Sequence, residues 1–252
     1  MRKEVDLGAE DKQVIMQLKY KGRTTLLRTF PADQGFWPDE QNVNAAFKRL
    51  LQARIPSIYF AVGELERSIY KKGEREYFAH TIAREKHGSL INMGFDVDTV
   101  NLAMQDIPAE SSLLVLADRR MELTPPVLSK LRSYISDGGN MLVLGKPGKQ
   151  YVLNPLLART GVQMMNGQLV QPTYNETPDK VRLYFTPAGL ALAEELAFMK
   201  YKYLWSNNVR KDSLEIVLPG VTGLFYAKNS GFVTTPLLMT SPGKAWLKAG
   251  EL

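Results

Sequence analysis

Two stretches near the start of the chain have the apolar content and length of β-strands. Residues 13–20 and 23–30 flank the pair Lys21-Gly22, and glycine supplies the positive φ that a tight turn requires. A β-hairpin is therefore expected. Residues 39–54 follow with apolar side chains spaced three and four apart, which predicts an amphipathic helix.

The middle of the chain alternates short apolar runs with helical patterns. Strands are expected at Ser57–Val62, 95–102, 113–117 and Met141–Leu144, and helices at 74–92 and Pro125–Ser136. Alternation of this kind is typical of right-handed βαβ crossovers. The sequence thus predicts an α/β fold with a doubly wound, mostly parallel sheet of flavodoxin-like layout.

The pattern is looser after Gly148. A short helix is expected at 152–159, closed by Gly161 in the left-handed conformation. A loop-rich excursion follows near 162–180. A further helix is expected at 188–201, and strands at 213–218, 223–227 and 232–239, which should be antiparallel and pair back onto the main sheet. The predicted domains are 1–54, a hairpin with its linking helix, and 55–252, the α/β domain.

Composition narrows the class of protein. The 252 residues are 44% hydrophobic and 23% charged, with a formal net charge of +6, as in a globular domain with a packed core. The basic residues are scattered, which favours a solvated surface over a nucleic-acid interface. Cysteine is absent, which excludes thiol chemistry and is compatible with an oxidising compartment. No apolar run reaches the roughly 18 residues of a membrane span, and the charged ends are those expected of a piece excised from a longer protein.

The only two histidines, His80 and His87, lie seven residues apart on the predicted helix 74–92, and Glu76 lies four residues before His80. A zinc site would need at least one further strong ligand. An exposed or capping pair of histidines is the plainer interpretation. No histidine accompanies a Gly-x-Ser-x-Gly turn, so a hydrolase triad has no support.

The segment 145–149 (GKPGK) follows a predicted strand, where ligands bind in open α/β sheets. It is not a nucleotide-binding loop, because Gln150 replaces the required hydroxyl and Pro147 removes an amide donor. Lys146 and Lys149 therefore mark either a looser contact with an anion or partner, or an ordinary turn.

Charged side chains follow two of the predicted parallel strands: Glu64, Glu66 and Arg67 follow the first, and Asp118, Arg119 and Arg120 follow the second. Both groups should meet at the carboxyl edge of the sheet. Paired carboxylates such as Glu64 and Glu66 can act in acid–base chemistry, but on a loop they are more often only solvated. We assign no catalytic residue, cofactor or metal, and regard these charges together with Lys146 and Lys149 as contacts for a ligand or partner.

Several segments taken together resemble the auxiliary component of gliding-motility-type ABC transporters. They are 55–60 (IPSIYF), 94–97 (GFDV), 107–117, 123–124, 134–144, 218–221 (LPGV) and 237–242 (LLMTSP) with Trp246. The resemblance runs from about residue 13 to residue 246. The family often carries Gly-His-Gly-Glu after its first core strand, where this chain has Gly63-Glu64-Leu65-Glu66. The layout also resembles class I glutamine amidotransferase-like domains, but their cysteine nucleophile is missing here.

The resemblance implies a non-enzymatic, extracytoplasmic (periplasmic) domain, held at the membrane by helices outside this sequence. Its partners would be an ABC-2 type permease and its ATPase, with a glycan or small ligand as a further candidate and no nucleic acid. The alternative is a carbohydrate- or acyl-processing enzyme that uses carboxylates such as Glu64 and Glu66 at the carboxyl edge. That alternative requires a closed pocket around these carboxylates.

Overall fold

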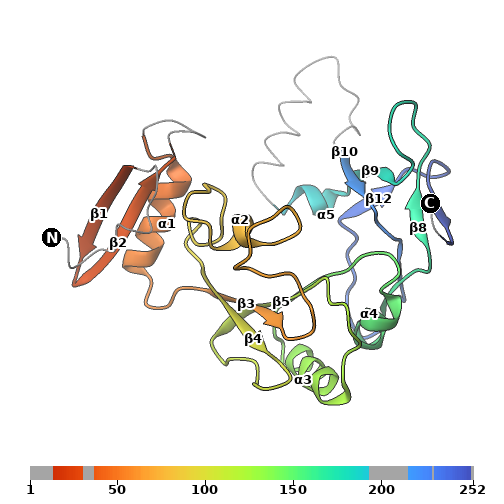
Figure 1. The fold of residues 1–252 in the computed structure, drawn as a ribbon, viewed down its shortest axis with the longest axis horizontal. Helices are drawn as coiled ribbons and strands as arrows, with labels where there is room; N and C mark the ends of the chain where they lie inside the picture. The colour runs from red at the N-terminus through yellow and green to blue at the C-terminus, as the bar shows by residue number, and fades with distance from the viewer. Residues whose placement is uncertain (1–13, 31–36, 193–214, 229, 251–252) are drawn as a thin grey trace. The chain divides into compact units, whose positions relative to one another are not determined.

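A computed structural model describes residues 14–30, 37–192, 215–228 and 230–250 (Figure 1). The chain divides into two compact units, Met1–Leu144 and Gly145–Leu252. This division differs from the predicted boundary between residues 54 and 55. The first unit contains both the N-terminal hairpin and the parallel sheet.

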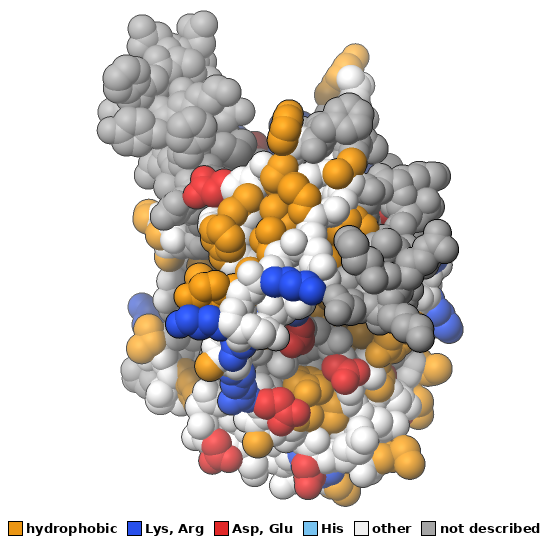
Figure 2. All heavy atoms as spheres, turned by 90° about the vertical axis from the view of Figure 1, so that its left-hand side faces the viewer, with side chains coloured by type: hydrophobic (Ala, Val, Ile, Leu, Met, Phe, Trp, Pro, Cys, Tyr) orange, Lys and Arg blue, Asp and Glu red, His pale blue; other side chains and the backbone are white. Residues whose placement is uncertain are grey.

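The N-terminal hairpin forms as predicted. β1 (Val14–Tyr20) pairs antiparallel with β2 (Arg23–Thr29). Lys21 and Gly22 have φ of 46° and 77°, and two positive φ angles match the right-handed twist of the flanking strands. Side chains such as Val14 and Tyr20 stay exposed, and Figure 2 shows hydrophobic side chains gathered on the side that carries the hairpin. A two-stranded hairpin needs further cover, which the first helix gives to β2.

α1 (Glu40–Leu51) is the predicted helix, slightly shortened at both ends. Its N-cap Asp39 accepts a hydrogen bond from the amide of Asn42, and the Asn42 side chain accepts one from the amide of Asp39. This capping box fixes the start of the helix. Near its end, Arg49 donates to the carbonyl of Phe95 and lies 2.7 Å from the Asp96 carboxylate. The hairpin and helix are thereby joined to the parallel sheet.

The parallel sheet of the first unit has four strands in the order β4-β3-β5-β6. The strands are β3 (Ser57–Val62), β4 (Asp96–Asn101), β5 (Ser111–Ala117) and β6 (Met141–Leu144). All three pairings are parallel. The chain places β4 on one side of β3 and then crosses to place β5 on the other side, so the strand order reverses between β3 and β5.

The two faces of this sheet are covered by different segments. Alternate residues of a strand point to opposite faces, and one face carries a cluster that includes Ile58, Phe60 and Val115. Leu114 and Leu116, the residues before and after Val115 in β5, are fully buried on the other face. α3 (Pro125–Ser136) contributes the buried Val127 and Leu131. In Figure 1 α3 is drawn below the sheet and α2 (Phe78–Thr81) above it.

The prediction of a long helix at 74–92 is wrong. Only α2 is helical there, and the rest of the segment consists of turns. The Asn92 side-chain amide donates to the carbonyls of Ala83, Arg84 and Lys86, which a continuous helix would need for its own amides. Gly88 further weakens a helix at this point. The apolar positions that suggested a helix still face the sheet, because Ile82 and Leu90 pack on the cluster.

The second unit begins with a helical segment and continues as short antiparallel strands. α4 (Gln150–Leu157) leads into a 3-10 turn, η1 (Ala158–Thr160), and Gly161 follows in the predicted left-handed conformation with φ 77°. The sheets are β10-β9-β12, β11-β7 and β13-β8. The strands are β7 (Val162–Met164), β8 (Gln168–Val170), β9 (Lys180–Phe185), β10 (Glu215–Pro219), β11 (Leu224–Tyr226), β12 (Leu238–Thr240) and β13 (Trp246–Lys248).

The C-terminal strands are antiparallel as predicted, but they do not pair with the main sheet. Their partners are β9, β7 and β8. β7 and β8 lie in the excursion predicted near 162–180, and β9 begins where that excursion ends. Of the helix predicted at 188–201, the described residues form α5 (Pro187–Leu190) and then a turn at 191–192. Residues 193–201 lie outside the described residues, as does the start of the strand predicted at 213–218. Among the described residues no helix is long and apolar enough to span a membrane.

Candidate functional site

The candidate site lies where the strand order of the parallel sheet reverses. In open α/β sheets the loops leaving two such strands diverge, and ligands bind in the crevice between them. Here the two loops are residues 63–67 after β3 and residues 118–122 after β5. We call these two loops the crest. Five of the eight predicted contact residues belong to its polar network.

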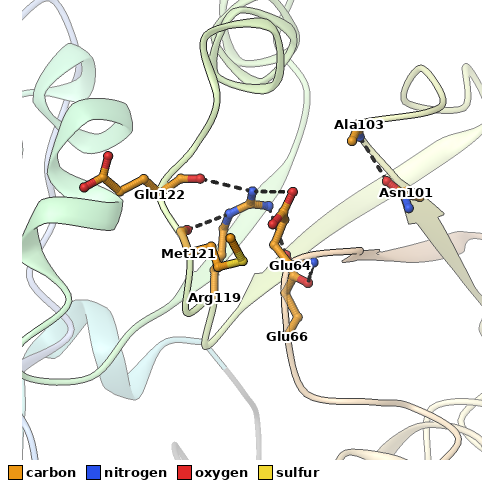
Figure 3. A network of polar contacts seen from close by, with 7 residues as sticks. All are labelled: Glu64, Glu66, Asn101, Ala103, Arg119, Met121 and Glu122. Atoms are coloured by element: carbon orange, nitrogen blue, oxygen red, sulfur yellow. Dashed lines mark hydrogen bonds and ion pairs between the residues drawn. The ribbon is translucent and has the colours of Figure 1, made fainter.

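Arg119 is the centre of the crest (Figure 3). Its side chain is 1% exposed, and its Nη1 lies 3.0 Å from Oε1 of Glu66, which is also 1% exposed. Nη2 lies 3.6 Å from Oε1 of Glu64. The Nε donates to the carbonyl of Met121 at 3.0 Å, and Nη2 donates to that of Glu122 at 3.4 Å. The guanidinium is thus surrounded by acceptors from both loops.

A second ion pair joins the two loops, with the arginine now on the loop after β3 and the carboxylate on the loop after β5. Arg67 Nε donates to Oδ2 of Asp118 at 2.9 Å, and the Asp118 side chain is 8% exposed. This hydrogen bond raises the pKa of the Arg67 guanidinium above its ordinary value. Arg67 also lies over the ring of Tyr77, whose pKa is raised mainly by burial. Each loop therefore gives an arginine to the other and receives a carboxylate from it.

The backbone of the crest is strained at the points where these side chains are presented. Leu65 and Asp118 have φ of 64° and 48°, and Gly63 has φ of 119°. Left-handed conformations of non-glycine residues cost about 1–3 kcal/mol each, and persist where the surroundings hold them. The Glu64 amide donates to Oε2 of Glu66 at 2.6 Å, which fixes the turn at Leu65. The ion pairs and the strain therefore belong to one arrangement.

The arrangement limits what Glu64 and Glu66 can do chemically. A general acid or base must reach the atom whose proton it transfers. Both oxygens of Glu66 are occupied, one by Arg119 and one by the amide of Glu64, and the side chain is almost fully buried. Glu64 is 19% exposed but also faces Arg119. The geometry therefore suits a rigid, internally neutralised edge better than an acid–base pair.

The remaining predicted contact residues are Arg120, Lys146 and Lys149. Arg120 is exposed. Lys146 and Lys149 belong to the second unit, where the Lys149 amide donates to the carbonyl of Lys146 at 3.3 Å and its Nζ lies 3.1 Å from the Tyr151 hydroxyl. These contacts form a turn at the start of α4. That Lys146 and Lys149 contact the same ligand or partner as the crest stays a prediction.

The two histidines do not share a helix face, because the helix predicted at 74–92 does not form. His80 lies on α2 and is exposed. His87 lies in a turn, with its Nε2 2.9 Å from Oδ2 of Asp39 and its ring edge-on to Phe30. Glu76 accepts a hydrogen bond from the amide of Ser68. Within the described ranges no group of three or more His, Asp or Glu is placed to hold a metal ion.

Sequence reasoning missed the groups that complete the crest. The carbonyls of Met121 and Glu122 carry no signal in the sequence, because any residue supplies a carbonyl. Asn101 at the end of β4 was also missed. A Cβ on Gly63 would lie 2.9 Å from the Asn101 amide group, so the loop after β3 passes directly over that side chain. The Gly after a strand was a usable signal, since glycine often marks a close approach.

We predict that Gly63→Ala destabilises the first unit by about 1–3 kcal/mol, because alanine would adopt φ 119° with strain and would press on Asn101. Hydrogen exchange of the β5 amides measures this, since it reports local and global opening of the unit. Adding Asn101→Ala should remove the steric part of the loss.

The matched control for this change is Gly138→Ala. Gly138 has φ 82°, but a Cβ there would meet nothing within 4 Å. Alanine at this position would therefore introduce backbone strain without a steric clash. If Gly63→Ala destabilised the unit no more than Gly138→Ala, and Asn101→Ala restored nothing, the close approach at the crest would have no energetic role.

No protein-family model matches the chain, and no curated protein sequence matches it. Among solved structures, the chain is similar to the one titled "mmIFT52 N-terminal domain", with a TM-score of 0.51 and 15% sequence identity over 75% of each chain. At that identity the similarity concerns the fold alone.

Proposed function

We propose that the chain is a non-catalytic, extracytoplasmic auxiliary domain of an ABC-2 type transport system of the gliding-motility kind. In this proposal the domain works beside a permease and an ATPase and is held at the membrane by helices outside this sequence. Its crest contacts a partner subunit, with a glycan or small ligand as the further candidate. We further propose that the sheet is doubly wound with a flavodoxin-like layout. The observed strand order β4-β3-β5-β6 supports this proposal.

The observation that carries the proposal is the closed ion-pair network of the crest. At a strand-order reversal an enzyme of this fold class would keep its reactive groups accessible to substrate. Here Arg119 and Glu66 are each 1% exposed and bound to each other. Arg67 and Asp118 bind each other between the same two loops. A surface of this kind is suited to holding a fixed shape for docking. The resemblance to the transporter auxiliary component gives the docking partner.

The first experiment is to sequence the full gene that encodes this chain and the genes beside it. The proposal expects hydrophobic spans to flank this sequence in the same gene, and expects genes for an ABC-2 permease and an ATPase beside it. A reading frame with neither the spans nor those neighbours would contradict it.

The alternative function is a carbohydrate- or acyl-processing enzyme that uses Glu64 and Glu66. Glu64 favours it slightly, because part of its side chain reaches solvent. We predict that Glu64→Gln leaves the rate of hydrolysis of nitrophenyl glycosides and nitrophenyl esters at the background level measured for the unaltered protein. The matched control is Glu122→Gln, at an exposed position. A turnover above background that Glu64→Gln abolishes and Glu122→Gln preserves would establish the enzyme.

A further inference from the structure

The connection that leaves the crest after β3 closes on itself as a compact loop. Residues 68–77 form its body, and the amide of Tyr77 donates to the carbonyl of Ser68 at 2.9 Å. The Ser68 amide donates to the Glu76 carboxylate at 2.5 Å. The Ser68 hydroxyl oxygen accepts hydrogen bonds from the amides of Tyr70 and Lys71. Loops of this length with adjoining ends are compact structures and are frequently functional.

The base of this loop is anchored in the core. Ile69 is fully buried in the cluster with Ile58 and Phe60, and Tyr77 packs against the same cluster. Within the loop, the Glu76 amide donates to the carbonyl of Gly73 at 3.2 Å. The backbone is therefore held in place before any partner arrives. A preorganised loop loses less conformational entropy on binding than a mobile one.

The tip of the loop, residues 70–75, has the side chains of a binding surface. All six residues are exposed, and the Tyr70 side chain is 58% exposed. The tip contains three cationic residues, Lys71, Lys72 and Arg75, and one acidic residue, Glu74. Lys72 Nζ lies 5.1 Å from the centroid of the Phe78 ring. In the described part of the chain, none of these three cations is joined to a carboxylate by an ion pair, and tyrosine and arginine are enriched among the residues that dominate interfaces.

We propose that the tip 70–75 binds an acidic segment of a protein partner that carries an aromatic or aliphatic side chain. This inference rests on the proposed docking function and names the chemistry of the partner. Tyr70 would pack on the apolar side chain, and Lys71, Lys72 and Arg75 would pair with its carboxylates. Charge complementarity at an exposed rim of this kind governs the encounter rate and the salt dependence of binding.

An anionic membrane is the less suitable partner. Basic clusters that recognise anionic lipids contain about four to eight Lys or Arg side chains. The tip has three, and it also carries one acidic residue, Glu74. A protein segment can place its carboxylates to match three fixed cations, whereas a lipid surface offers only its average potential.

The test uses the chain as given and a fluorescein-labelled acidic peptide in which glutamates flank one leucine and one phenylalanine. Fluorescence anisotropy should detect binding that weakens as salt rises, and a peptide with glutamine in place of glutamate should not bind. Lys71→Glu, Lys72→Glu and Arg75→Glu combined should weaken binding at least tenfold. Tyr70→Ala, which keeps the charges, should weaken it about threefold or more.

The matched control reverses three exposed cations outside the loop: Lys21→Glu, Arg54→Glu and Lys86→Glu. It changes the net charge equally and should weaken binding less than threefold. Equal losses in the two triple variants, or no binding of the acidic peptide by the unaltered chain, would overturn the proposal. So would phosphatidylglycerol vesicles that bind the chain through the same three cations.

Failure of this inference can be distinguished from failure of the proposed function. If the full-length protein co-purifies with an ABC-2 permease and an ATPase equally well with and without the loop substitutions, the function stands and the loop assignment is wrong. If the unaltered protein does not co-purify with them, the function itself fails.

Discussion

Arg119→Met is expected to lower the free energy of unfolding of the first unit by about 3–5 kcal/mol, because it leaves the buried carboxylate of Glu66 without its partner. Hydrogen exchange of the β5 amides measures this without interference from the second unit. A double-mutant cycle with Glu66→Gln measures the coupling free energy between the two side chains. The double variant should be more stable than the single Arg119→Met variant, since no unpaired buried charge remains.

The control for this prediction is Arg120→Met at the next position. Arg120 is exposed, and exposed ion pairs contribute only about 0–1 kcal/mol. Its substitution should therefore leave stability nearly unchanged. A loss at Arg119 no larger than that at Arg120, or a cycle without coupling, would show that the ion-pair network does not hold the crest together.

Leu131→Ala is expected to destabilise the first unit by about 2–5 kcal/mol, because Leu131 of α3 is fully buried and its truncation opens a cavity in the core. Leu128→Ala is the matched control on the same helix. Leu128 is only half-buried, so its loss should be clearly smaller. The same β5 amides report both variants, and equal losses would mean that α3 does not bury this face as described.

The strand and helix pattern was most informative where local chemistry and tertiary packing agree. α3 and β6 have the predicted bounds, because proline suits the first turn of a helix and the Asp137-Gly138-Gly139 segment ends it. The helix predicted at 74–92 does not form, because the apolar side chains of this segment, such as Ile82 and Leu90, reach the core from α2 and the turns around it. The choice depends on contacts of Asn92 with carbonyls earlier in the chain, which periodicity cannot reveal.

β9 shows the opposite error. It was not predicted, although Val181 and Leu183 alternate with Arg182 and Tyr184 and are buried. The two-residue period was present in the sequence. Without β9, the pattern offers β10 and β12 no partner other than the main sheet, although β9 is their partner in the structure.

The candidate site was predictable in its position but not in its connections. The alternation of strands and helices places Glu64, Glu66 and Arg67 beside Asp118 and Arg119, and the structure brings these five together. Which arginine meets which carboxylate depends on backbone turns at Leu65 and Asp118 with unusual φ. Leucine gives no signal for such a conformation, and aspartate adopts it more often than most residues but at only a minority of its positions. Burial and neutralisation of the pair could therefore not be foreseen.

The most direct test of the central claim is to purify the full-length protein from detergent-solubilised membranes and to quantify its partners by mass spectrometry. The proposal of a non-catalytic transporter domain predicts an ABC-2 permease and its ATPase in amounts comparable to the protein itself. Recovery of the protein without either of these subunits, in a fraction that turns over a glycoside or ester, would contradict it.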